Sequence, residues 1–168
     1  MKFTLKEERV DPVGAPDLLE FRLFDYFTSA THASVKDGVL KAFLQPGSPL
    51  RIVISTIAFG MGVDTPDICY VVHWGPPEDI EQYVQATERA GRDGNVSHAV
   101  ILYDKGLKRF VDDGMMNYCE NSDICRRKVL FYDFDTYIHD PENKGCMCCD
   151  VCSISYDYGN CENQVLFA

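Results

Sequence analysis

The chain has 168 residues, 46% apolar and 25% charged, which suits one ordinary globular domain with a small appendage and excludes a disordered protein. A formal net charge of −10 argues against nucleic-acid binding over the whole surface; the basic clusters at 105–109 and 126–128 are either local contacts or solvated helix faces. No segment is long and apolar enough to span a bilayer, and the first eight residues lack the apolar core of a signal peptide. We therefore expect an intracellular protein with no membrane partner.

The first 74 residues predict a strand, a helix and two further strands. Residues 1–20 are polar and predict an irregular lead-in, and the aromatic run at 21–29 predicts a strand. A helix follows and ends at Pro46-Gly47. Its apolar face carries Val35, Val39, Leu40, Phe43 and Leu44. Near-continuous apolar runs at 50–55 and 68–74 then predict strands that are buried on both sides.

The middle of the chain continues the alternation. Pro76-Pro77 predicts a helix start, with Ile80, Tyr83, Val84 and Thr87 facing inward and Gly91 and Gly94 after its end. A strand at 98–103, a helix from about 105 to 118 and another helix capped by Ser122 follow. This order predicts an α/β fold with a mostly parallel sheet, whose binding loops follow the strand ends.

Residues 85–94 read Gln-Ala-Thr-Glu-Arg-Ala-Gly-Arg-Asp-Gly and place two arginines three residues apart at a helix end. Arginine stays charged and forms a bidentate fork, so Arg89 and Arg92 could converge on one phosphate. An arginine in that role can accelerate phosphoryl transfer by about 10³–10⁵. Taken alone, the segment also fits a surface cluster of ion pairs with Glu88 and Asp93.

A glycine-rich loop strengthens the phosphate interpretation. Gly60 and Gly62 permit close backbone approach to a ligand, and Asp64 supplies an acceptor for a ribose or a metal-bound water. Together with the arginine segment, this loop predicts half of a nucleotide site.

The C-terminal region contains a cysteine cluster. Cys146, Cys149 and Cys152 follow Cys-x-x-Cys-x-x-Cys spacing, and Cys125 supplies a fourth thiolate from a helix upstream. Four thiolates satisfy a closed structural zinc site, which would contribute folding free energy to a segment too short for its own core. An iron–sulfur cluster, or Cys148 in place of Cys146, also fits the pattern.

These motifs resemble the RecQ family of superfamily 2 DNA helicases. Residues 58–64 (Ala-Phe-Gly-Met-Gly-Val-Asp) resemble motif V, residues 85–94 resemble motif VI, and residues 71–77 match the connector between them. The resemblance covers roughly residues 21–152. It implies a partial RecA-like parallel sheet flanked by helices over 21–112, a small helical zinc-binding module over 113–155 and a tail over 156–168.

The resemblance also implies roles for residues of the nucleotide site. Gly62, Asp64 and Gln85 would face the nucleotide, and Arg89 and Arg92 would approach the ATP phosphates as catalytic residues. The implied cofactors are ATP with Mg²⁺ and a structural Zn²⁺.

Other residues and partners follow from the same family. Thr56 and Gly60 would lie beside the nucleic-acid strand. The family moves 3′ to 5′ along single-stranded DNA and unwinds duplexes, so the implied partners are DNA with a 3′ tail and a first RecA-like domain. A nuclear location follows if the organism is eukaryotic. Arg126 and Arg127 would face a nucleic-acid backbone or pair with acids such as Asp133 and Asp135.

The sequence departs from the family at several points. Glu88 replaces a glycine and Ala86 a glutamate, so a carboxylate beside Arg89 competes with phosphate. The 168 residues contain no Gly-x-x-x-x-Gly-Lys-Ser/Thr phosphate loop, so we expect a fragment of a motor. The alternative is a non-catalytic, zinc-stabilised binding module. An RNA helicase of the DEAD-box type is a third reading, which the cysteine cluster and residues 59–62 oppose.

Overall fold

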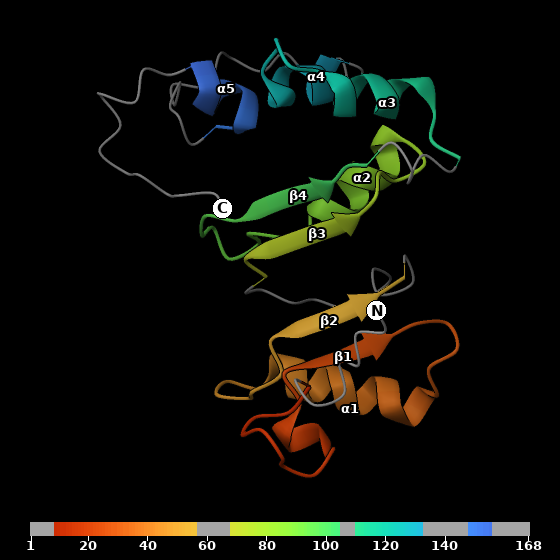
Figure 1. Ribbon diagram of the computed structural model, residues 1–168, viewed down its shortest axis with the longest axis vertical. Coiled ribbons are helices and arrows are strands. Elements are labelled where there is room, and N and C mark those ends of the chain that lie inside the picture. The colour runs from red at the N-terminus through yellow and green to blue at the C-terminus, as the bar shows by residue number, and fades with distance from the viewer. Residues whose placement is uncertain (1–8, 57–67, 105–109, 133–147, 156–168) are drawn as a thin grey trace. The chain divides into compact units, whose positions relative to one another are not determined.

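The computed structural model describes residues 9–56, 68–104, 110–132 and 148–155 (Figure 1). The chain forms two compact units, Met1–Ile68 with Gly91–Asn95 and Cys69–Ala90 with Val96–Ala168. Each unit contains one pair of parallel strands and at least one helix, so the predicted α/β class with a parallel sheet is confirmed. No helix among these residues is long and apolar enough to cross a membrane.

The first unit is a strand–helix–strand arrangement with a short helical turn before it. The turn η1 spans Leu19–Phe21, β1 spans Phe24–Phe27, α1 spans Ala33–Leu44 and β2 spans Ile52–Ser55. The strands β1 and β2 are parallel, with Phe24 opposite Ile52. Phe27, Val39 and Leu50 form the buried core, which joins β1, α1 and the approach to β2. The predicted helix face is therefore confirmed at Val39, whereas Val35 and Leu44 are exposed.

The segment before β1 is anchored more firmly than the predicted irregular lead-in. Val10 is buried and forms an antiparallel bridge with Arg22. The Asp25 carboxylate is only 4% exposed and accepts hydrogen bonds from Arg9 and Arg22. A buried carboxylate needs such partners, so these two arginines hold the lead-in against β1.

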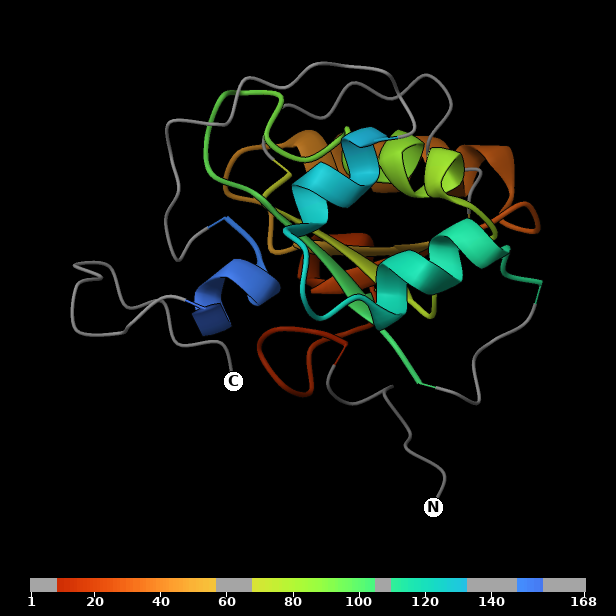
Figure 2. The ribbon, with the colours of Figure 1, turned by 90° about the horizontal axis from the view of Figure 1, so that it is seen from above.

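The second unit combines the second strand pair with four helices among the residues that the structure describes. Its strands are β3 (Tyr70–Trp74) and β4 (His98–Leu102), which are parallel. Its helices are α2 (Ile80–Thr87), α3 (Asp113–Glu120), α4 (Arg126–Tyr132) and α5 (Asp150–Ser155). Tyr83 of α2 forms the buried core with Met115 and Tyr118 of α3. Side chains of α4 complete this core, and Figure 2 shows α4 beside α2.

The helices begin later than the sequence predicted, because side-chain caps decide where they start. The Asp79 carboxylate accepts the Gln82 N–H at 2.7 Å, so α2 begins at Ile80 and not at Pro77. The Asp112 carboxylate accepts the Met115 N–H at 2.7 Å in the same way, so the prediction of a helix through Phe110 was wrong. Phe110 itself has a φ of 57°, a left-handed conformation that a helix does not accommodate.

The prediction of Ser122 as a helix cap was also wrong. Its hydroxyl bonds to Asp123, and α4 begins at Arg126, directly after Cys125. The turn between α3 and α4 is closed by Asn121, whose side-chain oxygen accepts the Ile124 N–H at 3.0 Å. Cys125 therefore precedes the first turn of α4.

The strand β3 is covered on one face. Val71 and His73 are partly buried, whereas Tyr70, Val72 and Trp74 are exposed, with Trp74 at 82%. The strand β2 likewise exposes Ile52 and Ile54. The prediction of strands buried on both sides was therefore wrong for the part of the chain that the structure describes. Successive side chains of a strand point to opposite faces, and along β3 the exposed and the partly buried residues alternate accordingly.

Candidate nucleotide and metal sites

The arginine segment follows the end of α2. Gln85 lies exposed in the last turn of this helix, and Glu88 is its C-cap, whose N–H donates to the Val84 carbonyl at 2.9 Å. Gly91 has a φ of 71°, the left-handed conformation that commonly ends a helix. The helix α2 itself ends at Thr87, with Glu88 as its C-cap, so the prediction that Gly91 ends it was wrong; Gly91 lies in the turn that follows.

The two arginines differ in their surroundings. Arg89 is partly buried and belongs to the second unit, whereas Arg92 is exposed and belongs to the first. Their convergence on one anion therefore stays a prediction. Asp93, which the ion-pair alternative assigned to an arginine, accepts the backbone N–H of Asn95 at 3.0 Å and its side-chain amide at 2.7 Å. These hydrogen bonds lower the pKa of Asp93 and close the turn after Arg92.

The motif V residues 58–64 lie outside the described residues, but Thr56, just before them, is described. Thr56 directly follows β2 and is exposed, as a residue at a nucleic-acid surface must be. Gly60, Gly62 and Asp64 lie outside the described residues, and their predicted roles stay predictions.

The structure brings four cysteines together at one point. Their sulfur atoms all lie within 4.8 Å of one another, and the Cys125 and Cys148 sulfurs are 3.6 Å apart. Tetrahedral zinc–thiolate bonds of about 2.3 Å place ligand sulfurs about 3.8 Å apart, so the cluster fits a four-thiolate metal ion. The members are Cys125, Cys148, Cys149 and Cys152. The cluster thus contains three of the four predicted ligands; the fourth, Cys146, lies outside the described residues, and its role stays a prediction beside that of Cys148.

Local backbone geometry favours the thiolate form at one of these cysteines. Burial raises the pKa of Cys125, but the N–H groups of Arg127 and Lys128 and the Cys148 thiol outweigh burial and lower this pKa to about 7. Burial raises the pKa of Cys148 and of Cys152. A metal ion binds the deprotonated sulfur, so this lowered pKa favours Cys125 as a ligand.

Arg126 ties the cysteine cluster to the core of the second unit. Its guanidinium donates to both carboxylate oxygens of Asp150, from Nε to Oδ1 at 2.5 Å and from Nη2 to Oδ2 at 2.7 Å. The remaining nitrogen, Nη1, donates to the Tyr118 carbonyl at 2.6 Å, and the guanidinium carbon lies 5.3 Å from the centre of the Tyr118 ring. The sequence predicted Asp133 and Asp135 as candidate partners, but both lie outside the described residues. The structure assigns Arg126 to Asp150, which stands between Cys149 and Cys152.

Three aromatic rings continue from Tyr118 to the end of β3. The rings of Tyr118 and Tyr83 are 5.3 Å apart, and so are those of Tyr83 and His73. Burial lowers the pKa of His73, and its Nε2 has no hydrogen-bond partner among the described residues. This arrangement supports a structural role for His73, as a neutral imidazole packed on Tyr83.

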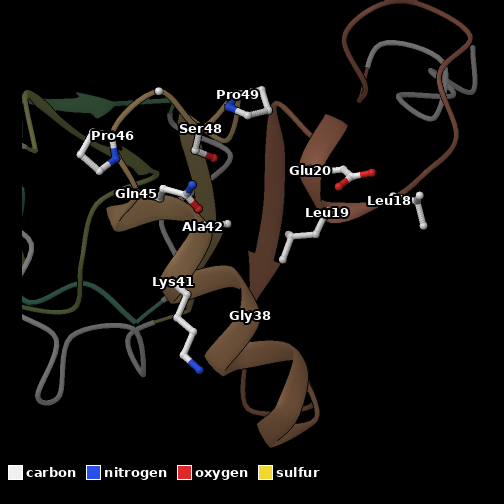
Figure 3. A pocket seen from close by; sticks show the side chains of 11 residues that line it. Leu18, Leu19, Glu20, Gly38, Lys41, Ala42, Gln45, Pro46, Ser48 and Pro49 are labelled. Carbon is white, nitrogen blue, oxygen red and sulfur yellow. The ribbon is translucent and has the colours of Figure 1, made fainter.

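A shallow hollow of about 650 Å³ lies elsewhere, on the first unit (Figure 3). Its walls come from η1, from the last turns of α1 and from the loop at 45–49. None of the predicted site residues lines it. Lys41 is the single cation at its edge and Glu20 the single acid, so it shows no concentration of charge suited to a phosphate.

Comparison with known proteins agrees with this geometry. Residues 5–94 match the family model described as the helicase conserved C-terminal domain. The chain belongs to the helicase C-terminal domain family, in its RecQ-like branch. The matched stretch includes the lead-in, β1, α1 and β2 of the first unit, β3 and α2 of the second unit, and the arginine segment. The strand β4 and the helices α3 to α5 lie beyond it.

Individual relatives define the branch. The chain is 36% identical over 122 residues to the RecQ-like DNA helicase blm-1 of Caenorhabditis elegans, covering 60% of this chain and 12% of that protein. It is 34% identical over 138 residues to the ATP-dependent helicase SGS1 of Saccharomyces cerevisiae, covering 69% and 9%. It is 33% identical over 117 residues to the ATP-dependent DNA helicase Q1 of Rattus norvegicus, covering 60% and 18%. The chain thus spans less than a fifth of each of these proteins.

Sequence reasoning missed two residues of the metal region. Asp150 was visible as the acid inside Cys-Asp-x-Cys, but nothing in the spacing indicated that it would hold Arg126. Tyr118 carried no signal beyond its helical position, although its carbonyl and ring both contact Arg126.

Proposed function

We propose that this chain supplies the second RecA-like part of an ATP-dependent 3′–5′ DNA helicase. The observation that supports the proposal most strongly is the family match through residues 85–94, which ends at the arginine segment after α2. The relatives named blm-1, SGS1 and Q1 are ATP-dependent or DNA helicases by name, and each is far longer than this chain. In this proposal, the shared segment is the part of the motor that closes onto ATP.

In this proposal the arginines act on the phosphates of ATP. Arg89 follows a helix whose inner face is held by Tyr83, so packing of that helix sets the position of Arg89. Arg92 follows Gly91 and precedes the turn closed by Asp93 and Asn95. Phosphoryl transfer depends on positioning and charge neutralisation, and two cations on short, well-defined segments suit it.

The remaining parts of the nucleotide and DNA sites come from the motif V loop and from a partner domain. Gly62, Asp64 and Gln85 would contact the nucleotide with its Mg²⁺, and Thr56 and Gly60 would contact one DNA strand. A phosphate loop is absent from the 168 residues, so ATP hydrolysis requires a first RecA-like domain. DNA with a single-stranded 3′ tail would be the substrate, and a nuclear location would follow in a eukaryote.

We further propose that the metal at the cysteine cluster is Zn²⁺ in a structural role. The four clustered sulfurs form a closed, all-thiolate ligand set, which suits a structural metal with no open position for chemistry. The helix α5 has six residues and carries one ligand, Cys152. A helix of this length is unstable alone, so the metal would hold it against α4.

One observation favours a second candidate, a zinc-stabilised module without ATPase activity. Glu88 is exposed at the C-cap of α2, directly before Arg89, where it can attract either arginine away from a phosphate. Charge competition of this kind reduces phosphate binding without disturbing the fold.

A reconstituted ATPase assay distinguishes the two candidates. The purified 168-residue chain is mixed with the first RecA-like domain of a RecQ-like helicase, and ATP hydrolysis is measured with and without single-stranded DNA. We expect hydrolysis in the mixture that DNA stimulates, and loss of about 10³-fold or more with Arg92→Ala. Hydrolysis by the mixture that stays at the level of the first domain alone would refute the motor proposal and favour the non-catalytic module.

A further inference from the structure

The cysteine cluster and the helix before the arginine segment are joined by one continuous series of contacts. Asp150 lies between two clustered cysteines and is held at both oxygens by Arg126. Arg126 in turn contacts the carbonyl and the ring of Tyr118, and the Tyr118 ring packs on Tyr83 of α2. Every member belongs to the second unit.

We propose that Arg126 is a positioning residue that transmits metal binding at the cysteine cluster to α2, the helix that precedes Arg89. The consequence of this link for ATP hydrolysis rests on the proposed function, but the contacts between the cysteine cluster and α2 do not depend on ATP. In this proposal, bound metal holds α5 and therefore Asp150 in place. Asp150 then orients the Arg126 guanidinium, and the guanidinium orients Tyr118, whose ring packs on α2.

The geometry assigns this role to Arg126 and not to its neighbour. The planar arginine fork donates two parallel bonds to both carboxylate oxygens and a third bond from its other nitrogen; the three donors of a lysine sit on one nitrogen and cannot span these separate acceptors in the same geometry. The third donor satisfies the Tyr118 carbonyl in the last turn of α3, where carbonyls have no partner within the helix. Arg127 is exposed and follows on the same helix, so it provides a control with the same charge and the same backbone setting.

The helix α2 can respond to a displacement of Tyr118 because its stability comes from packing. It has eight residues, fewer than an isolated helix needs in water. Its buried residue is Tyr83, which lies between Tyr118 and His73. A small displacement of the Tyr118 ring therefore changes how well α2 is held, and with it the position of the residues that follow.

Hydrogen exchange measured by mass spectrometry on the whole chain tests the link. Exchange of the α2 amides is compared with Zn²⁺ bound and after removal by a chelator, with α1 of the first unit as the internal reference. In the wild type, removal of Zn²⁺ should speed exchange in α2 on the order of tenfold and leave α1 unchanged. Unchanged α2 exchange after Zn²⁺ removal would overturn the proposal.

Matched variants separate positioning from a merely structural role. Arg126→Lys should keep Zn²⁺ bound at one ion per chain, yet show fast α2 exchange that no longer responds to Zn²⁺. Arg127→Lys should behave as the wild type. Equal Zn²⁺ dependence in the two variants would overturn the proposal. If Arg126→Lys fails to fold or to bind Zn²⁺, Asp150→Asn takes its place, because it frees the fork and leaves Arg126 on Tyr118.

The same samples separate this inference from the proposed function. Zn²⁺-dependent ordering of α2 without ATP hydrolysis in the reconstituted mixture would leave the link standing and refute the motor. DNA-stimulated hydrolysis with α2 indifferent to Zn²⁺ would do the reverse.

Discussion

Removal of the Tyr83 side chain should be among the most damaging single changes in the second unit. Tyr83 is 4% exposed, and its ring packs on both His73 and Tyr118 at 5.3 Å between centres. Truncation of a large buried aromatic side chain typically costs about 3–5 kcal/mol, of which each aromatic pair supplies roughly 0.5–1.5 kcal/mol. We therefore expect Tyr83→Ala to lower the free energy of unfolding by about 3–5 kcal/mol.

Two further variants show whether packing or the hydroxyl carries this effect. The Tyr83 hydroxyl lies 3.5 Å from that of Tyr118, at the long limit for a hydrogen bond, so Tyr83→Phe should cost less than about 1 kcal/mol. Tyr132 belongs to the same unit and is 86% exposed, so Tyr132→Ala should change stability by less than about 0.5 kcal/mol.

Urea titration followed by near-ultraviolet circular dichroism measures all three variants. With a urea slope of about 1–3 kcal/mol per molar, Tyr83→Ala should shift the midpoint by more than about 1 M. A shift for Tyr83→Ala no larger than that for Tyr132→Ala would refute the packing argument. Equal losses for Tyr83→Phe and Tyr83→Ala would transfer the effect from the ring to the hydroxyl.

Three further tests, with four variants, address separate parts of the account. Cys146 and Cys148 are the two candidates for the fourth zinc ligand, and Cys146→Ser and Cys148→Ser distinguish them. The variant that lacks the true ligand should lose bound zinc and have a lower melting temperature. Zinc retained in both variants would contradict a four-cysteine site that uses either residue. Burial lowers the pKa of His73, so the unfolded chain takes up this proton at a higher pH than the folded chain does, and stability should fall as pH drops below about 6.5. His73→Gln should make the melting temperature depend less on pH between pH 7 and 5.5. An unchanged pH dependence would contradict the burial argument for His73. Glu88→Gly should raise DNA-stimulated ATP hydrolysis in the reconstituted mixture, whereas an unchanged rate would show that Glu88 does not compete with phosphate.

The order of elements was predictable because each leaves a strong pattern in the sequence. Short apolar runs between helical faces gave the strands, and the alternation of strand and helix gave the parallel pairing. The cysteine spacing was equally direct, since thiolates three residues apart favour one metal ion. The convergence of Cys125, Cys149 and Cys152 follows from that chemistry.

The helix starts and the burial of the strands were not predictable from the same patterns. Apolar periodicity locates the face of a helix, but the carboxylates of Asp79 and Asp112 decide the first residue through single hydrogen bonds. The exposure of Ile52 and Tyr70 depends on which elements cover a sheet, a property of tertiary structure that an apolar run does not contain.

The ion pair between Arg126 and Asp150 was not predictable from the sequence for a related reason. Twenty-four residues separate it from Asp150, and nearer acids stood in the sequence. The partner is set by the approach of α5 to α4, which the cysteine cluster brings about. The role of a charged side chain next to a metal ligand therefore becomes visible only when the ligands are placed in space.

The most direct test of the central claim is a strand-separation assay with the reconstituted mixture of this chain and a first RecA-like domain. Duplexes with a 3′ or a 5′ single-stranded tail are compared in the presence of ATP and Mg²⁺. The account predicts ATP-dependent separation of the 3′-tailed duplex and none above background for the 5′-tailed one. No separation of either duplex by a mixture whose zinc is fully bound would contradict the assignment of this chain to a helicase motor.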